Sequence, residues 1–104
     1  MIVTAWKGGH YKKGQGTYGL RVSISDRDKL FKKSWKSVQL KLWKWPKTAE
    51  VRICPSFWNK CSELKSKEIK SWLCSKKLDN WPKGKPPKFS LEPVSEACFI
   101  VKLL

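Results

Sequence analysis

Arginine, acidic residues and histidine are scarce in this chain of 104 residues. Eight residues are acidic, His10 is the one histidine, and the only arginines are Arg21, Arg27 and Arg52. Serine and cysteine hydrolases need a nucleophile with a partner histidine, so a single histidine gives that chemistry little support. Lysine suits phosphates, whereas the arginine fork suits base edges, so the shortage of arginine favours contacts to a nucleic-acid backbone over sequence readout.

The four cysteines lack the spacing of a metal site. They include no CxxC pair, and His10 lies far upstream of the first of them, so a structural zinc site is not expected. The first residues lack the pattern of a signal peptide, and no apolar run reaches the roughly 18 residues of a membrane span. We therefore expect an intracellular, cytoplasmic protein without membrane association. Its cysteines are expected to be reduced and mostly packed, although a disulfide remains an open alternative.

Lysine, by contrast, is abundant. Lysine and arginine together number 23, the formal net charge is +15, and seven residues are tryptophan. Disorder requires low hydrophobicity as well as high charge, and 40% hydrophobic residues argue against it. Self-repulsion of this size is usually tolerated because the partner is a polyanion. Nucleic acid is the leading candidate for that partner, ahead of an anionic membrane surface.

Alternation of apolar and polar residues predicts most of the strands. A short strand over residues 2–6 is expected at a sheet edge, and the segment from Tyr18 to Ile24 places alternate apolar side chains on one face. Residues 37–54 have the pattern of a hairpin that turns at PKTA. KFSLEP and CFIVKL close the chain as two further strands. The chain has no internal repeat and no long linker, so residues 1–104 are expected to form one basic domain.

Two helical sections interrupt these strands. Ser25 or Asp26 can cap a short helix with acids early and lysines late, as the helix dipole prefers. Residues 56–64 carry apolar side chains at helical spacing, and residues 66–78 continue the pattern, as one bent helix or as two. The predicted fold is mainly β or α+β: a small antiparallel pseudobarrel with two short helical segments.

The glycine-rich stretch WKGGHYKKGQGTYG, residues 6–19, lacks the GxxxxGK[ST] pattern of a nucleotide-binding loop. A strand rather than a helix is expected after it, which also argues against that function. We interpret residues 6–17 as a flexible Gly/Lys-rich loop. Its Lys7, Lys12 and Lys13 would contact phosphates and Tyr11 would offer a stacking face.

Further candidate contacts lie in the second strand, in the first helix and in the proline-rich loop WPKGKPPK. They are Arg21, Arg27, Lys32, Lys33, Lys83, Lys85 and Lys88. Trp45, in the hairpin, is a candidate base-stacking platform, with a covered hairpin face as the equal alternative. Trp81 either joins a phosphate clamp or anchors its loop to the core.

The order of elements resembles that of B3-like pseudobarrel DNA-binding domains. There a strand leads to a short helix, here LRVSISDRDKLF, and then to a hairpin, here VQLKLWKWPKTAEVRIC. A second helix, here EIKSWLCSKKL, precedes the final strands. The family's glycine-aspartate turn before its late strand is replaced by WPKGKPP. Three segments also look like those of small uncharacterised prokaryotic proteins: YGLRVSISDRDKLFKKSW, FWNKCSELKSKEIKSWL and WPKGKPPKFSLEP. The B3-like resemblance implies a pseudobarrel that binds DNA.

Together these features predict a non-enzymatic nucleic-acid-binding domain, with duplex DNA favoured over RNA and with lysine-phosphate contacts as the main interaction. No catalytic residue, metal or cofactor is expected. The first alternative is a metal-dependent nuclease, because Asp26, Asp28 and Glu50 could gather around a cation. Helix capping is the preferred role for the two aspartates. The second alternative is a module that binds RNA or an acidic protein.

Overall fold

The computed structural model describes residues 1–8, 17–59, 62–78, 81–82 and 84–104. The strands within these ranges are β1 (Ile2–Gly8), β2 (Thr17–Arg21), β3 (Ser37–Leu42), β4 (Thr48–Arg52), β5 (Glu63–Lys65), β6 (Lys88–Ser95) and β7 (Cys98–Leu103). The helices are α1 (Ile24–Leu30), the short 3₁₀ helix η1 (Pro55–Trp58) and α2 (Lys67–Ser75). The protein is therefore mostly β, with two short α-helices.

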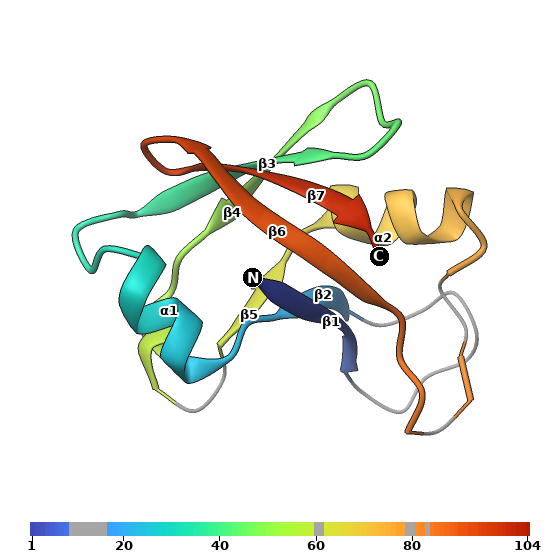
Figure 1. Ribbon diagram of the computed structural model, residues 1–104, viewed down its shortest axis with the longest axis horizontal. Helices are drawn as coiled ribbons and strands as arrows, with labels where there is room; N and C mark the ends of the chain where they lie inside the picture. Colours follow the sequence, from blue (N-terminus) through green and yellow to red (C-terminus); the bar gives the residue numbers. More distant parts are fainter. Residues whose placement is uncertain (9–16, 60–61, 79–80, 83) are drawn as a thin grey trace.

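The strands form one sheet in the order β4-β3-β7-β6-β1-β2-β5, which curls into a nearly closed barrel (Figure 1). Neighbouring strands are antiparallel except for β3 and β7, which run parallel. The two edge strands, β4 and β5, approach each other without pairing, so a seam runs between them. The expected small barrel of the α+β class is confirmed.

Alternation along the strands separates the core from the surface. In β3, Val38, Leu40 and Leu42 are buried and the residues between them face outward. The inward side chains of the sheet join Ile69 and Trp72 of α2 in a single core. The predicted hairpin over residues 37–54 and the apolar stripe of the second helix are confirmed, because each had a clear period.

Three expectations near the amino terminus are wrong. β1 is an inner strand, because it pairs with both β6 and β2. β2 ends at Arg21, and Ile24 begins α1 with 53% of its surface exposed. The cap of α1 is Ser23, whose hydroxyl accepts a hydrogen bond from the Asp26 N–H at 3.1 Å. Because the cap lies two or three residues earlier than expected, the helix starts sooner and Ile24 belongs to the helix rather than to the strand.

The helix expected over residues 56–64 does not form. Residues Pro55–Trp58 make a single 3₁₀ turn, and Glu63–Lys65 pair with β2 as strand β5. Leu64 is fully buried, but from a strand. Gly19 of β2 pairs with Lys65, and a Cβ atom at Gly19 would come within 2.5 Å of the Leu64 carbonyl oxygen. Only a glycine lets β5 lie this close to β2.

The Gly/Lys-rich loop expected over residues 6–17 begins and ends in regular structure. Residues 6–8 belong to β1 and Thr17 belongs to β2, so the expected loop is too long at both ends. The rest of it, with Tyr11, Lys12 and Lys13, lies outside the described residues. No helix in the described ranges is long and apolar enough to cross a membrane.

The cysteines that are described are not mostly packed, contrary to expectation. Cys54 and Cys74 are exposed and Cys98 is half-buried. Cys54 and Cys98 are free thiols. Cys61 lies outside the described residues.

Candidate nucleic-acid interface

Lysines from distant parts of the sequence come to one end of the barrel. This end carries α2, the 81–88 loop, the end of β1 and the turn between β3 and β4, whereas α1 lies at the other end of the longest axis (Figure 1). We call this surface the basic end. Its lysines are Lys7, Lys44, Lys47, Lys65, Lys67, Lys70, Lys76, Lys77, Lys85 and Lys88. Among the described residues of α2, the 81–88 loop, the end of β1 and the 43–47 turn, the single acid is Glu68; β5, which supplies Lys65, also carries Glu63.

The 81–88 loop is fastened to the barrel through Trp81. The edge of the Trp81 ring meets buried Tyr18, with ring centroids 6.3 Å apart. Lys7 places its Nζ atom 5.0 Å from the centroid of Trp81, and the Ala5 N–H donates to the Pro87 carbonyl at 2.9 Å. Trp81 therefore anchors its loop, and exposed Lys85 projects from a fixed support.

The turn between β3 and β4 is fastened to α2. Trp72 donates its indole N–H to the Trp43 carbonyl at 2.8 Å, and Lys76 Nζ donates to the Lys44 carbonyl at 3.3 Å. The ammonium groups of Lys44 and Lys76 lie 4.6 and 5.5 Å from the centroid of the Trp43 ring. Trp45 is half-buried against the core rather than an open platform.

A third lysine-tryptophan pair lies on the outer face of the sheet. Lys65 on β5 places its Nζ atom 4.8 Å from the centroid of Trp6 on β1. The two residues share a row with Gly19 of β2, which stands between them. Because Gly19 has no side chain, Lys65 can reach across β2 to the indole.

Lys32 and Lys33 do not belong to the basic end. Lys32 pairs with Glu96 at 3.0 Å, and Trp35 donates its indole N–H to the same carboxylate at 3.0 Å. Hydrogen bonds from Lys32 and Trp35 lower the pKa of Glu96. Lys33 places its Nζ atom 5.8 Å from the Trp58 ring. Both lysines follow α1 in the chain, and Lys32 is engaged by an acidic side chain.

Arg27, a candidate nucleic-acid contact from the sequence, is buried in the structure. Its guanidinium donates to the carbonyls of Phe57 and Asn59 at 3.0 and 2.9 Å, and only 6% of the residue is exposed. Asp28 accepts a further bond at 3.0 Å. Arg27 is committed to protein acceptors because α1 turns it toward η1. Arg21 is more exposed, but it is paired with Glu63 at 3.3 Å.

The carboxylates considered for a nuclease are separated. Asp26 accepts a hydrogen bond from the Ser23 hydroxyl at 2.9 Å, and Asp28 pairs with Arg27. Glu50 lies on the outer face of β4. Within the described ranges, no three His, Cys, Asp or Glu side chains come together in a group that could hold a metal ion.

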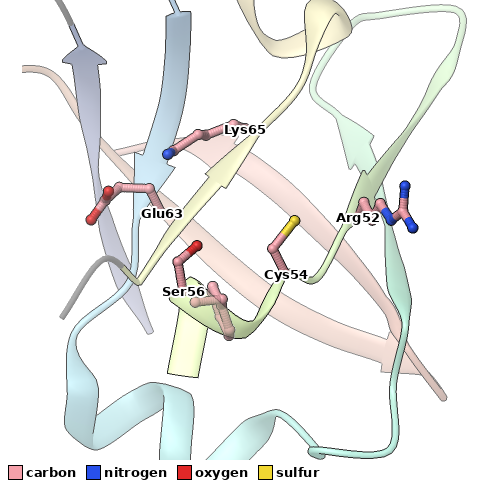
Figure 2. Close-up of a pocket in the computed structure, with 6 residues that line it drawn as sticks. Arg52, Cys54, Ser56, Glu63 and Lys65 are labelled. Carbon is pink, nitrogen blue, oxygen red and sulfur yellow. The ribbon is translucent and has the colours of Figure 1, made fainter. Parts of the chain in front are cut away.

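A pocket of about 150 Å³ lies at the seam of the barrel (Figure 2). It is lined by Arg52, Cys54, Ser56, Phe57, Glu63 and Lys65. Figure 2 shows Arg52 and Glu63 pointing in opposite directions, away from Cys54 between them. Glu63 is engaged by Arg21, and Lys65 by the Trp6 ring. Two of the three charged side chains of this pocket, Glu63 and Lys65, are thus engaged by residues outside it.

The basic end contains only part of the set nominated from the sequence. It brings together Lys7, Lys85 and Lys88. Four other candidates lie outside the described residues: Tyr11, Lys12, Lys13 and Lys83. Sequence reasoning missed the lysines of α2 and of the 43–47 turn. The sequence contained a signal for the lysines of α2, because they lie on the side of the helix away from its buried apolar stripe and must therefore face solvent.

Comparison of the chain with protein-family models, with curated proteins and with solved structures finds no match. The resemblance to B3-like domains therefore remains a prediction. The geometry of the basic end is therefore the guide to the protein's function.

Proposed function

We propose that this protein binds nucleic acid, duplex DNA in particular, with the basic end against the phosphate backbone. The main supporting observation is the segregation of charge. The basic end has Glu68 in α2 and, beside Lys65 on β5, Glu63, which is paired with Arg21. The other described acids lie in α1, on β4 and in the β6–β7 hairpin: Asp26, Asp28, Glu50, Glu92 and Glu96. Clustered positive charge raises the local concentration of a polyanion and releases its counterions on binding.

The tryptophans of the basic end favour phosphate contacts. Lys7, Lys65 and Lys76 each lie within 5.5 Å of an indole centroid. An ammonium held over an aromatic ring is restricted in its motion, so less side-chain entropy is lost when a phosphate binds. The same contacts cover the indole faces, so a base could stack there only after displacing a lysine. Both effects favour a duplex over an unpaired strand at these positions.

Arginine contributes little to this surface. Arg27 is buried, Arg21 is paired with Glu63 through its Nε atom, and exposed Arg52 lies at the seam pocket. The basic end therefore includes none of the three guanidinium groups that could make a bidentate contact to guanine in the major groove. Binding through lysine and phosphate is largely independent of sequence. We therefore expect similar affinities for duplexes of different sequence.

The proposal is tested by fluorescence anisotropy with a blunt duplex across a range of salt concentrations. Contact with about six phosphates predicts that log K falls against log salt with a slope of about −5. Double-stranded RNA and polyglutamate, measured in parallel, test the two alternative partners. The proposal is wrong if the duplex does not bind at low salt, or if polyglutamate binds more tightly than the duplex.

A further inference from the structure

A second pocket lies at the margin of the basic end, between the β3–β4 turn and the first turns of α2. It measures about 170 Å³ and is lined by Trp45, Lys47, Lys67, Glu68 and Ser71. Its two walls are held together close by, where the turn is hydrogen-bonded to α2 through Trp72 and Lys76. We call it the Trp45 pocket.

The four polar side chains that line the Trp45 pocket have no protein partners within the described part of the chain; Lys47, Lys67 and Ser71 are exposed and Glu68 is half-buried. Neither lysine forms an ion pair there, and the Glu68 carboxylate and the Ser71 hydroxyl make no hydrogen bond. The indole N–H of Trp45 is buried and also lacks an acceptor. Buried polar groups in native proteins are usually satisfied, and the exceptions require an explanation. The seam pocket differs, because Glu63 and Lys65 are engaged there.

The pocket combines an aromatic ring, two cations, a carboxylate and a hydroxyl, and this combination restricts the chemical class of ligand that it can bind. A simple anion would use Lys47 and Lys67 but would be repelled by Glu68, and an uncharged ring would leave both lysines unused. A nucleotide would use every lining side chain: the indole forms a wall for the base, the carboxylate and hydroxyl face its edge, and the ammonium groups bind its phosphate. Carboxylates accept hydrogen bonds from exocyclic amino groups such as cytosine N4.

We propose that the Trp45 pocket binds one unpaired nucleotide whose base carries an exocyclic amino group. This inference rests on the proposed function, because the nucleotide would belong to a nucleic acid bound at the basic end. Lys44 and Lys76 lie on the two elements that form the pocket, so an unpaired nucleotide at the end of a bound duplex reaches it while neighbouring phosphates contact these lysines. The pocket thereby adds a preference for duplex ends with an overhang.

The pocket itself is tested without a nucleic acid, by NMR titration of the ¹⁵N-labelled protein with cytidine 5′-monophosphate. The resonances of the Trp45 indole N–H and of the Glu68 and Ser71 amides should shift, with an affinity about tenfold higher than for uridine 5′-monophosphate, which has the same sugar but lacks the exocyclic amino group. Glu68→Ala should abolish that preference, and Glu50→Ala, which removes a carboxylate outside the pocket, should retain it. Equal affinities for the two nucleotides and for inorganic phosphate would overturn the inference.

The source of the nucleotide is tested with duplexes that are blunt, or that end in one unpaired cytidine or one abasic residue. The cytidine overhang should bind several-fold more tightly than the other two, and Glu68→Ala should remove the difference. If all three duplexes bind equally, the overhang preference is wrong while nucleic-acid binding stands. If no duplex binds but cytidine monophosphate shifts the pocket resonances, the proposed function is wrong, while nucleotide binding by the Trp45 pocket is supported.

Discussion

Arg27 joins two segments of the chain from a buried position. Its guanidinium leaves α1 and donates to the carbonyls of Phe57 and Asn59, at the end of η1. It also lies 5.3 Å from the centroid of the Trp58 ring. These contacts satisfy carbonyls that η1 is too short to use itself. The residue is therefore part of the structure that holds α1 against the barrel.

Replacing Arg27 with methionine should lower the free energy of unfolding by about 2 kcal/mol, because acceptor carbonyls lose their donors. Urea denaturation followed by tryptophan fluorescence measures this change. Lys29→Met is the matched control on the same helix; Lys29 is exposed, so its effect should stay within about 0.5 kcal/mol. Equal effects of the two substitutions would show that Arg27 has no special structural role.

The tryptophans show how far the burial of a single residue can be predicted from the sequence. Trp72 shares a helical stripe with Ile69 and Leu73; that stripe predicts a core position, and Trp72 is fully buried. The apolar spacing around Trp58 predicts a core position too, but Trp58 is half-buried, since η1 ends after one turn. The lysine that covers Trp6 comes from β5, and this pairing depends on strand order. No local pattern in the sequence contains that information.

At the scale of the elements, the segment after Pro55 shows how local spacing can mislead. Phe57 and Leu64 are both buried, as a helical stripe would require, but they reach the core from η1 and from β5. The free edge of β2 offers hydrogen bonds to a strand, and Gly19 leaves room for it. Tertiary pairing thus overrides a helical spacing that only a few residues support.

A similar long-range contact ties the β6–β7 turn to the segment that follows α1. Glu96 accepts hydrogen bonds from Lys32 and Trp35, and both lower its pKa. A carboxyl group with a lowered pKa in the folded state stabilises the fold above its ordinary pKa. That contribution is lost as the pH falls through the lowered value.

Substitution of Lys32 by serine should raise the pKa of Glu96, because it removes the hydrogen bond from Lys32, which is the main cause of the lowered pKa. An NMR titration of the side-chain carboxyl carbon measures the value directly. Lys29→Ser removes the same charge from α1 without touching Glu96, and it should leave this pKa unchanged. An unchanged pKa in Lys32→Ser would mean that the ion pair does not persist in solution.

At the scale of the whole molecule, the sequence predicts the class of fold better than the distribution of charge. Alternation in β3, β6 and β7 was sufficient to predict a small β barrel with two short helices. The basic end arises only when closure of the barrel brings α2, the 81–88 loop and the end of β1 together. Strand order depends on contacts between residues far apart in sequence, which periodicity does not report.

The most direct test of the central claim compares two variants that lose equal charge from opposite ends of the molecule. One carries Lys70→Gln, Lys77→Gln and Lys85→Gln at the basic end, and the other carries Lys29→Gln, Lys33→Gln and Lys36→Gln near α1. Salt titrations on one blunt duplex give the slope of log K against log salt for both variants and for the parent. The basic-end variant should have a slope shallower by about three, roughly one unit for each lost phosphate contact, and the α1 variant should keep the parent slope. Equal losses in both variants, or an unchanged slope in the basic-end variant, would contradict binding through the basic end.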